Sequence, residues 1–128
     1  MPHVTVEYSA NLDDKVDMKA LCETIRKAML ATGIFELGAV RVRAIRCDAY
    51  AIADALPENA FIDISLRMGE GRSMEVKKTA GTAISYSAGT FLDRLFETPH
   101  FALSVEVREI SSELSWKKNA MHARLRDA

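Results

Sequence analysis

The residue best suited to acid–base chemistry stands at the start of the chain. Met1 is followed by Pro2, and a small residue such as proline at this position favours removal of the initiator methionine. Pro2 would then carry a free secondary amine. Burial near cations lowers the pKa of an amine toward neutrality, and such an amine is a competent general base. The alternative interpretation is that Pro2 only governs processing, so its role needs support from other residues.

Arginines support a catalytic role for Pro2, because their positions indicate an anionic substrate. Arg41 and Arg43 alternate with apolar residues and therefore lie on one face of an expected strand. Arg72 stands between Gly71 and Ser73, where an expected strand gives way to a helix. A guanidinium group can hold a carboxylate through two hydrogen bonds, and a helix start adds free N–H groups. Arg41 and Arg72 are therefore candidate substrate-binding residues, whereas Arg43 is interpreted as a surface side chain.

The histidines and cysteines indicate neither a metal nor a cofactor. His3, His100 and His122 share no metal-ligand spacing, and no glycine-rich loop suggests a nucleotide. His3 adjoins Pro2 and is a candidate site residue, with a structural hydrogen bond as the alternative. Cys22 and Cys47 are interpreted as reduced thiols of a cytoplasmic protein.

The elements that must position these residues follow one pattern twice. Each half shows apolar–polar alternation, then apolar residues at helical spacing, then alternation again. Asp13 or Asp14 is expected to cap the first helix, Gly33 to end it and Ser73 to cap the second. The expected strands are residues 3–8, 39–46, 62–68 and 101–108, and the expected helices are residues 14–32 and 73–96.

A single α/β (α+β) domain over residues 1–128 follows from this duplicated strand–helix–strand pattern. A strand–helix–strand unit gives parallel strands, and the two units are expected at about residues 2–56 and 60–116. Pairing the units places Ala60 opposite Pro2 and Glu106 opposite Arg41.

Composition restricts the partners. The 128 residues carry 17 Lys and Arg against 18 Asp and Glu, so the formal net charge is -1 and no basic footprint predicts a nucleic-acid partner. No apolar run is long enough for a membrane span, and no secretory signal is recognisable. We therefore expect neither a nucleic-acid nor a membrane partner.

An uncharged stretch of small residues bears on assembly. Residues 79–92 contain no charged side chain, although a helix is expected there and surface helices normally carry a charged face. We expect part of this helix to be buried in an oligomer. The alternative is a helix that packs only on its own sheet and has a small, polar outer face.

Several motifs together resemble the tautomerase superfamily. Pro2 opens the first strand, Gly69-Glu70-Gly71-Arg72-Ser73 follows the third, and the unit is duplicated. Within that superfamily, the chain from Pro2 to about His122 looks like the 5-carboxymethyl-2-hydroxymuconate isomerase family. The segments that carry this likeness are Pro2-His3, Val6-Glu7-Tyr8-Ser9, Ala31-Thr32-Gly33-Ile34-Phe35, Gly71-Arg72-Ser73 and Trp116-Lys117-Lys118-Asn119.

The resemblance implies a tautomerase-like, four-stranded sheet with two helices on one face, and a homotrimer with active sites near subunit contacts. It implies that Pro2 moves a proton from the hydroxyl of a small carboxylated dienol to carbon without a cofactor, in aromatic (homoprotocatechuate) catabolism. Because Ala60 opens the second unit, only Pro2 can supply the amine, and one working site per chain is expected.

The resemblance also assigns binding roles. Arg41 and Arg72 occupy positions where the family carries substrate-binding arginines. Trp116 falls near the aromatic position that walls the pocket, with a hydrophobic plug as the alternative. Lys117 and Lys118 are expected to be solvated tail residues, with added positive potential at the site as the alternative. The other functions considered are a different proline-based tautomerase, decarboxylase or dehalogenase, and a non-catalytic trimeric binding protein.

Overall fold

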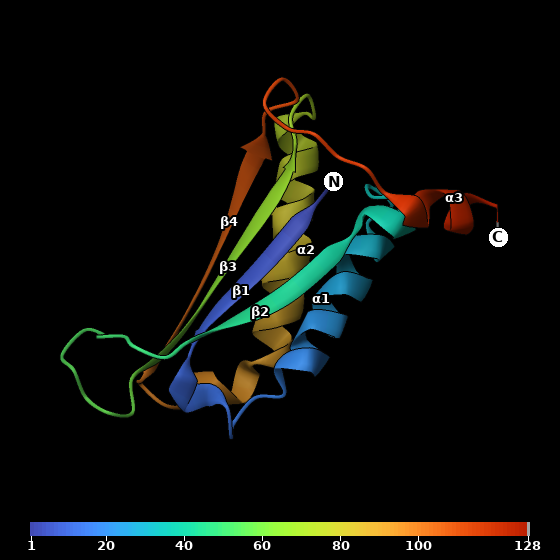
Figure 1. Ribbon diagram of the computed structural model, residues 1–128. Helices are drawn as coiled ribbons and strands as arrows, with labels where there is room; N and C mark the ends of the chain where they lie inside the picture. Colours follow the sequence, from blue (N-terminus) through green and yellow to red (C-terminus); the bar gives the residue numbers. More distant parts are fainter. Residues whose placement is uncertain (128) are drawn as a thin grey trace.

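The computed structural model describes residues 1–127, in which four strands form one mixed sheet (Figure 1). The strands lie in the order β2-β1-β3-β4. β1 is parallel to β2, β3 is parallel to β4, and the two pairs meet antiparallel along β1 and β3. The strand bounds are His3–Ser9 for β1, Arg41–Cys47 for β2, Ala60–Gly69 for β3 and Phe101–Ile110 for β4.

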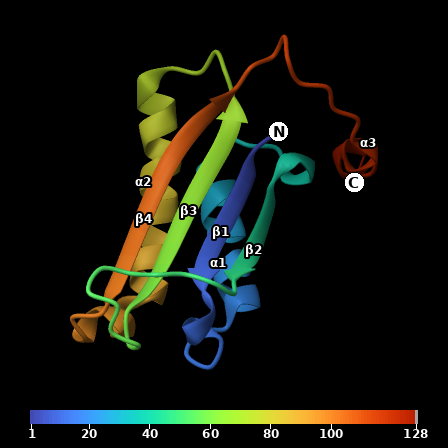
Figure 2. The same cartoon turned by 60° about the vertical axis from the view of Figure 1, so that its left-hand side comes forward.

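Two long helices, α1 (Met18–Ala31) and α2 (Met74–Phe91), cover the same face of this sheet (Figures 1 and 2). A third, short helix, α3 (Ala120–Arg126), lies beyond the β2 side of the sheet. The α/β fold expected from the duplicated pattern is therefore confirmed. Three 3₁₀ turns complete the described chain: η1 (Ala10–Leu12), η2 (Leu37–Ala39) and η3 (Asp93–Glu97).

The core forms where alternate strand residues meet the apolar stripes of the helices. A fully buried aliphatic side chain contributes about 1.5–3 kcal/mol, so this layer fixes the sheet against α1 and α2. The opposite face of the sheet carries polar and charged side chains, among them His3, Arg43 and Arg67. The fully buried core residues include Val4, Val6, Leu21, Ile25, Met29, Ile64, Leu66, Met68 and Ile84.

The first helix begins at Met18 rather than at residue 14, so the prediction of its cap was wrong. Asp17 is the N-cap, and its side chain accepts a hydrogen bond from the Ala20 N–H at 3.0 Å. Asp13 and Asp14 cannot cap the helix because η1 and the following turn still occupy this stretch. At the other end, Gly33 has a φ of +73°, which favours glycine, as expected.

The second helix begins as expected but ends early. Ser73 is its N-cap and accepts a hydrogen bond from the Val76 N–H at 3.2 Å. The helix ends at Phe91 rather than at residue 96, and η3 follows. Within the uncharged stretch the sheet covers only one stripe, since Tyr86 on the outer side is 76% exposed. No helix within residues 1–127 is long and apolar enough to span a membrane.

Candidate active site

The start of the chain lies beside a cavity of about 500 Å³. Pro2 is buried immediately before β1, and the parallel register places His3 opposite Arg41 at the start of β2. The cavity walls come from the chain start, the α1–β2 connection, the β3–α2 turn and the C-terminal segment. They consist of Met1, Ile34, Phe35, Glu36, Ala39, Arg72, Lys117, Asn119, His122 and Arg126.

Met1 is one of the residues that line this cavity. Its Sδ atom is 3.2 Å from Nη1 of Arg41 and 3.3 Å from Nδ2 of Asn119. The guanidinium of Arg41 also donates to the Ala39 carbonyl at 3.2 Å, which fixes its position. Arg41, one of the predicted substrate-binding residues, therefore meets the chain start directly.

Arg72 reaches the same cavity from the turn before α2. Gly71 has a φ of +94°, a conformation that side chains disfavour, and this turn presents the next residue to the cavity. Nη1 of Arg72 donates to the Ile34 carbonyl at 3.1 Å, and its guanidinium lies 5.3 Å from the centre of the Phe35 ring. These contacts order an otherwise exposed arginine.

The cations around the chain start weaken the charged form of its amine. Partial burial, then the proximity of Lys117, and then of Arg41 and Arg72, lower the pKa of the Met1 amino group below its usual value, and the same cations lie near the adjacent Pro2. Lys117 is exposed, as expected for a solvated tail residue, and it also lines the cavity. Sequence reasoning placed Lys117 and Asn119 in a segment that carries the family resemblance but did not predict that they line this cavity, because no local periodicity tells where an irregular segment crosses the fold.

His3 adjoins Pro2 but faces the open side of the sheet. Its Nδ1 lies 3.3 Å from Nη1 of Arg43. Burial and the guanidinium groups of Arg67, Arg43 and Arg41 lower the pKa of His3 to about 4. His3 is therefore neutral at pH 7, and it is not among the residues that line the cavity.

Trp116 does not reach the cavity of its own chain. Its side chain is 87% exposed, and the nearby Leu114 is 76% exposed. Both lie on the irregular segment between β4 and α3. Of the predicted site residues, Arg72 lines the cavity, and Pro2 and Arg41 adjoin Met1, which forms one of its walls. His3 faces the open side of the sheet, and Trp116 is exposed.

The second unit corrects one predicted correspondence. If Ala60 matches Pro2, then Phe61 matches His3, and the parallel partner of Phe61 is Ala102. Ala102 therefore stands where Arg41 stands in the first unit, while Glu106 pairs with Ser65 further along. The alignment of Arg41 with Glu106 was wrong because the connections in the two units differ in length.

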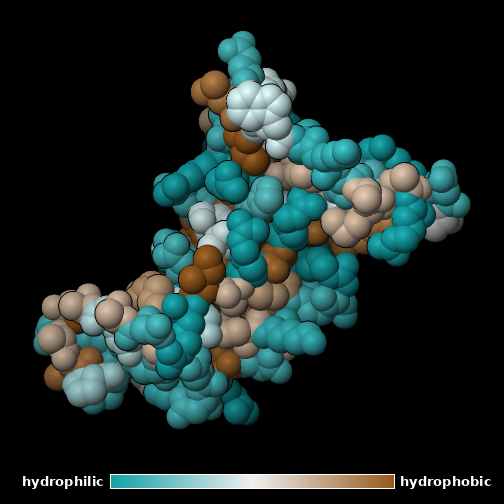
Figure 3. Space-filling view, viewed as in Figure 1, coloured by the Kyte–Doolittle hydropathy of each residue, from teal (hydrophilic) through white to brown (hydrophobic). Residues whose placement is uncertain are grey.

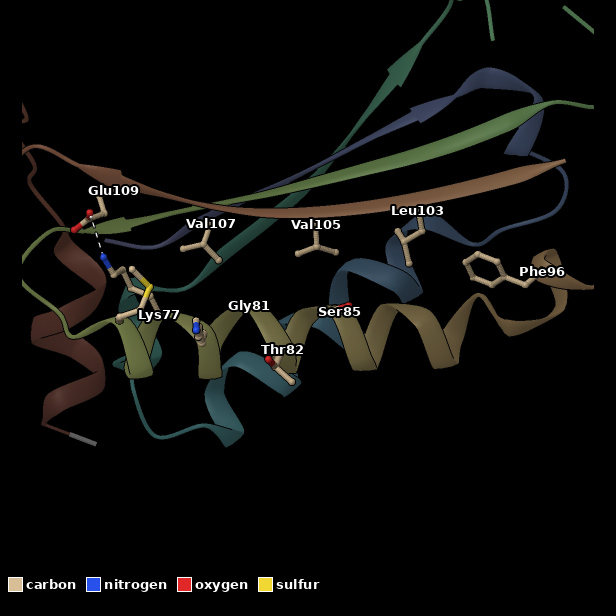
Figure 4. Close-up of a pocket in the computed structure, with 11 residues that line it drawn as sticks. Lys77, Gly81, Thr82, Ser85, Phe96, Leu103, Val105, Val107 and Glu109 are labelled. Carbon is tan, nitrogen blue, oxygen red and sulfur yellow. Dashed lines mark ion pairs between the residues drawn. The ribbon is translucent and has the colours of Figure 1, made fainter. Parts of the chain in front are cut away.

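A larger cavity, of about 720 Å³, lies between α2 and β4 (Figure 4). Leu103, Val105 and Val107 point into it from the strand, and Lys77 pairs with Glu109 at one end at 3.3 Å. This cavity contains neither the chain start nor an arginine, so the smaller one remains the candidate site. Within residues 1–127, no group of three or more His, Cys, Asp or Glu residues is arranged to hold a metal ion.

Comparisons with known proteins identify the family of the chain. Residues 2–125 match the family model of 5-carboxymethyl-2-hydroxymuconate isomerase. A 5-carboxymethyl-2-hydroxymuconate Delta-isomerase of Escherichia coli is 34% identical over 123 residues, which is 96% of this chain and 98% of that protein.

Solved structures show that the similarity includes the fold. The crystal structure of a 5-carboxymethyl-2-hydroxymuconate isomerase from Deinococcus radiodurans R1 superposes with a TM-score of 0.90 at 38% identity, covering 96% of this chain and 92% of that one. A fused 4-OT, described as a symmetric trimer, shares the fold with a TM-score of 0.68 at 20% identity, covering 91% of this chain and 93% of that one. The chain belongs to the 5-carboxymethyl-2-hydroxymuconate isomerase family and has the tautomerase fold.

Proposed function

We propose that the protein is a 5-carboxymethyl-2-hydroxymuconate isomerase that uses Pro2 as its base. The observation that carries this proposal is the meeting of Arg41, Arg72 and Lys117 at the amino-terminal end of β1. These cations suit a substrate with several carboxylates and also keep an amine at this point from being fully protonated. The names of the family and of its similar members indicate the same substrate.

The reaction needs only one proton to be moved. After loss of Met1, the Pro2 amine accepts the proton of the substrate's enol hydroxyl and becomes an ammonium. The electron pair left on oxygen forms the C=O bond, and the dienolate shifts its double bonds toward the far end of the diene. The ammonium then donates the same proton to carbon, so the product is an isomeric, conjugated oxo acid and the amine is restored.

The arginines stabilise the charges of this reaction. Arg72, ordered against Ile34 and Phe35, holds one carboxylate, and Arg41 holds another. Both guanidinium groups and Lys117 also stabilise the negative charge that develops on the dienolate. His3, neutral and beside Pro2, contributes as a hydrogen-bonding neighbour of the substrate-binding region.

A homotrimer accounts for the apolar side chains that the single chain leaves in solvent. Tyr86 on α2 and Leu114 are each 76% exposed. Apolar atoms also gather on the projecting loop of residues 48–59, at the lower left of Figure 3, where Tyr50 and Leu56 are 40% and 44% exposed. Tyrosine and other large side chains of this kind are enriched where subunits meet, and these exposed residues are therefore candidates for the subunit contacts.

Trp116 is assigned to the site of a neighbouring subunit in this trimer. The indole is exposed on a segment that runs outward from the sheet, and an aromatic wall would further lower the pKa of the Pro2 amine by desolvation. Light scattering coupled to gel filtration should give three times the mass of the chain. A monomer would rule out both the trimer and this role for Trp116.

The experiment for the enzymatic function combines mass and absorbance. Intact-mass spectrometry of native protein should show a chain that begins at Pro2, and the same sample should convert 5-carboxymethyl-2-hydroxymuconate from its enol to its conjugated keto form in an ultraviolet assay. A correctly processed chain that leaves the enol absorbance unchanged would contradict the proposal.

A further inference from the structure

We propose that Asn119 is a substrate-binding residue, whose side-chain amide forms a carboxylate subsite together with the guanidinium of Arg41. This inference rests on the proposed function in one respect, namely that Met1 is absent from the working protein. It assigns to the C-terminal segment a direct part in substrate recognition.

Two nitrogen donors converge on one point in the cavity. Nη1 of Arg41 and Nδ2 of Asn119 lie 3.2 and 3.3 Å from the same atom, Sδ of Met1. A thioether sulfur is a weak acceptor, so the pair of donors is poorly matched to its present occupant. An oxygen at this place would lie within about 0.2 Å of normal N–H···O distances from both donors.

The amide of Asn119 is held in the orientation that this role requires. Its Oδ1 accepts from the Met121 N–H at 2.9 Å, and Nδ2 donates to the Gly38 carbonyl at 2.8 Å. These two partners fix which end of the amide is oxygen and which is nitrogen. One N–H of the amide is thus used within the fold, and the other is directed at the cavity.

Close packing of α3 brings Asn119 to this place. A Cβ atom at position 38 would lie 3.0 Å from Nδ1 of His122 and 3.3 Å from its backbone nitrogen, so Gly38 permits the close approach of α3 to η2. Arg126 adds two hydrogen bonds to the Glu36 carboxylate, at 2.6 and 2.7 Å. The subsite is therefore preorganised before substrate binds.

The occupant of the subsite is a carboxylate because one of the two donors is permanently charged. Arg41 favours an anionic oxygen over a neutral hydroxyl, and Lys117 adds positive charge at the same cavity. Removal of Met1 frees both donors at the same time as it frees the Pro2 amine. The substrate carboxylate then takes the place of the sulfur.

The test uses muconate, an unreactive unsaturated dicarboxylate, as the probe. Asn119→Asp keeps an oxygen to accept from Met121 but removes the amide donor and adds a negative charge. In calorimetric titrations of the chain that begins at Pro2, this variant should bind muconate at least about tenfold more weakly, as expected for loss of a hydrogen bond to a charged group. KM for the enol substrate should rise by a similar factor, with kcat changed by less than about threefold.

Asn11→Asp is the matched control. Nδ2 of Asn11 also donates to two backbone carbonyls, of Asn59 at 2.8 Å and of Pro57 at 3.3 Å, but at the opposite end of the sheet. The control should lower stability and leave muconate affinity at the wild-type value. In addition, titration of the wild-type chain with muconate should shift the Asn119 side-chain amide resonances in NMR spectra, which needs no variant.

Retention of Met1 gives a second test. The chain that keeps Met1, produced with methionine aminopeptidase inhibited, should bind muconate at least about tenfold more weakly than the chain that begins at Pro2, because sulfur fills the subsite. Equal affinities, an unchanged Kd in Asn119→Asp, or no muconate binding by the wild type would each overturn the subsite. Wild-type binding that depends on Asn119, without any ketonisation, would support the subsite and refute the proposed function.

Discussion

The two units begin alike and are used differently. The first unit starts with Pro2, which has no N–H, next to Arg41 and Asn119, each of which donates to one backbone carbonyl and also contacts the thioether of Met1. The second starts with Ala60, whose N–H donates to the His100 carbonyl at 2.8 Å. Just before it, Asn59 is buried and its side chain is bonded on both sides, to His100, Asp54 and the Ile52 carbonyl.

The difference shows how one backbone arrangement serves either chemistry or stability. At the second unit every donor of Asn59 has a good acceptor, so this end fixes the connection between β2 and β3 and leaves nothing for a ligand. At the first unit Arg41 and Asn119 are each held by one backbone carbonyl, and the further N–H that each directs at Met1 has only a thioether as its acceptor, as in a binding site without its ligand.

The largest effect on the functional difference between the two units is expected from Pro2→Ala. The variant keeps an amine at the chain start but changes its basicity and position, so kcat/KM should fall by about a hundredfold, within the range of general-base contributions. Steady-state assays with 5-carboxymethyl-2-hydroxymuconate measure the effect. Ala60→Gly, at the matching position of the second unit, should leave turnover unchanged; a loss of equal size there would erase the functional difference between the units.

Arg72→Ala should affect binding more than turnover. It removes a guanidinium that is ordered against Ile34 and Phe35, so KM should rise about tenfold or more, the cost of losing a charged hydrogen bond. Arg26→Ala serves as the control, because Arg26 pairs only with Glu23 on the surface of α1. An unaltered KM and kcat in Arg72→Ala would remove that residue from the site.

Asn59→Ala should act on stability alone. It removes the side-chain amide that donates to the Ile52 carbonyl and the Asp54 carboxylate and accepts from His100, and the free energy of unfolding should fall by about 1–3 kcal/mol. Urea denaturation measures this change, and kcat/KM of the folded variant should equal that of the wild type. If Asn59→Ala had the stability of the wild type but impaired turnover, the start of the second unit would serve activity and not stability, contrary to the proposal.

The smallest effect concerns His3 and pH. Because the pKa of His3 is lowered to about 4 in the folded chain, the unfolded chain binds more protons between pH 4 and 6.5. Stability should therefore rise with pH across this window through His3 and be fully present above pH 6.5. In His3→Gln this part of the pH dependence should vanish in urea denaturation at pH 4.5 and 7.5; an identical pH profile would place the responsible group elsewhere.

Periodicity predicted the layers because period 2 and helical spacing reflect which side chains are buried. Val4 and Val6, or Leu21 and Ile25, are buried as their spacing requires. The cap at Asp17 was not predicted because Asp13, Asp14 and Asp17 all precede the helix. The position of η1 and the turn after it determines that only Asp17 stands directly before α1. Such a choice depends on tertiary contacts that no local pattern encodes.

The candidate site was predictable only in part. Pro2, Arg41 and Arg72 lie at strand ends and a helix start, so the topology brings them together. Lys117 and Asn119 come from an irregular segment whose path is fixed by contacts with η2, such as the bond from Asn119 to Gly38. The place of Trp116 depends on an assembly, which a single chain does not determine.

The cavity joins the first residue to residues 117–126, and this has a consequence for biosynthesis. A chain grows from its amino terminus, so Met1 leaves the ribosome long before Lys117, Asn119 and α3 exist to surround it. During that interval the terminal methionine is open to its aminopeptidase. Residues 117–126 are made later and then supply the remaining wall, so the pocket is completed only after the chain start has been exposed.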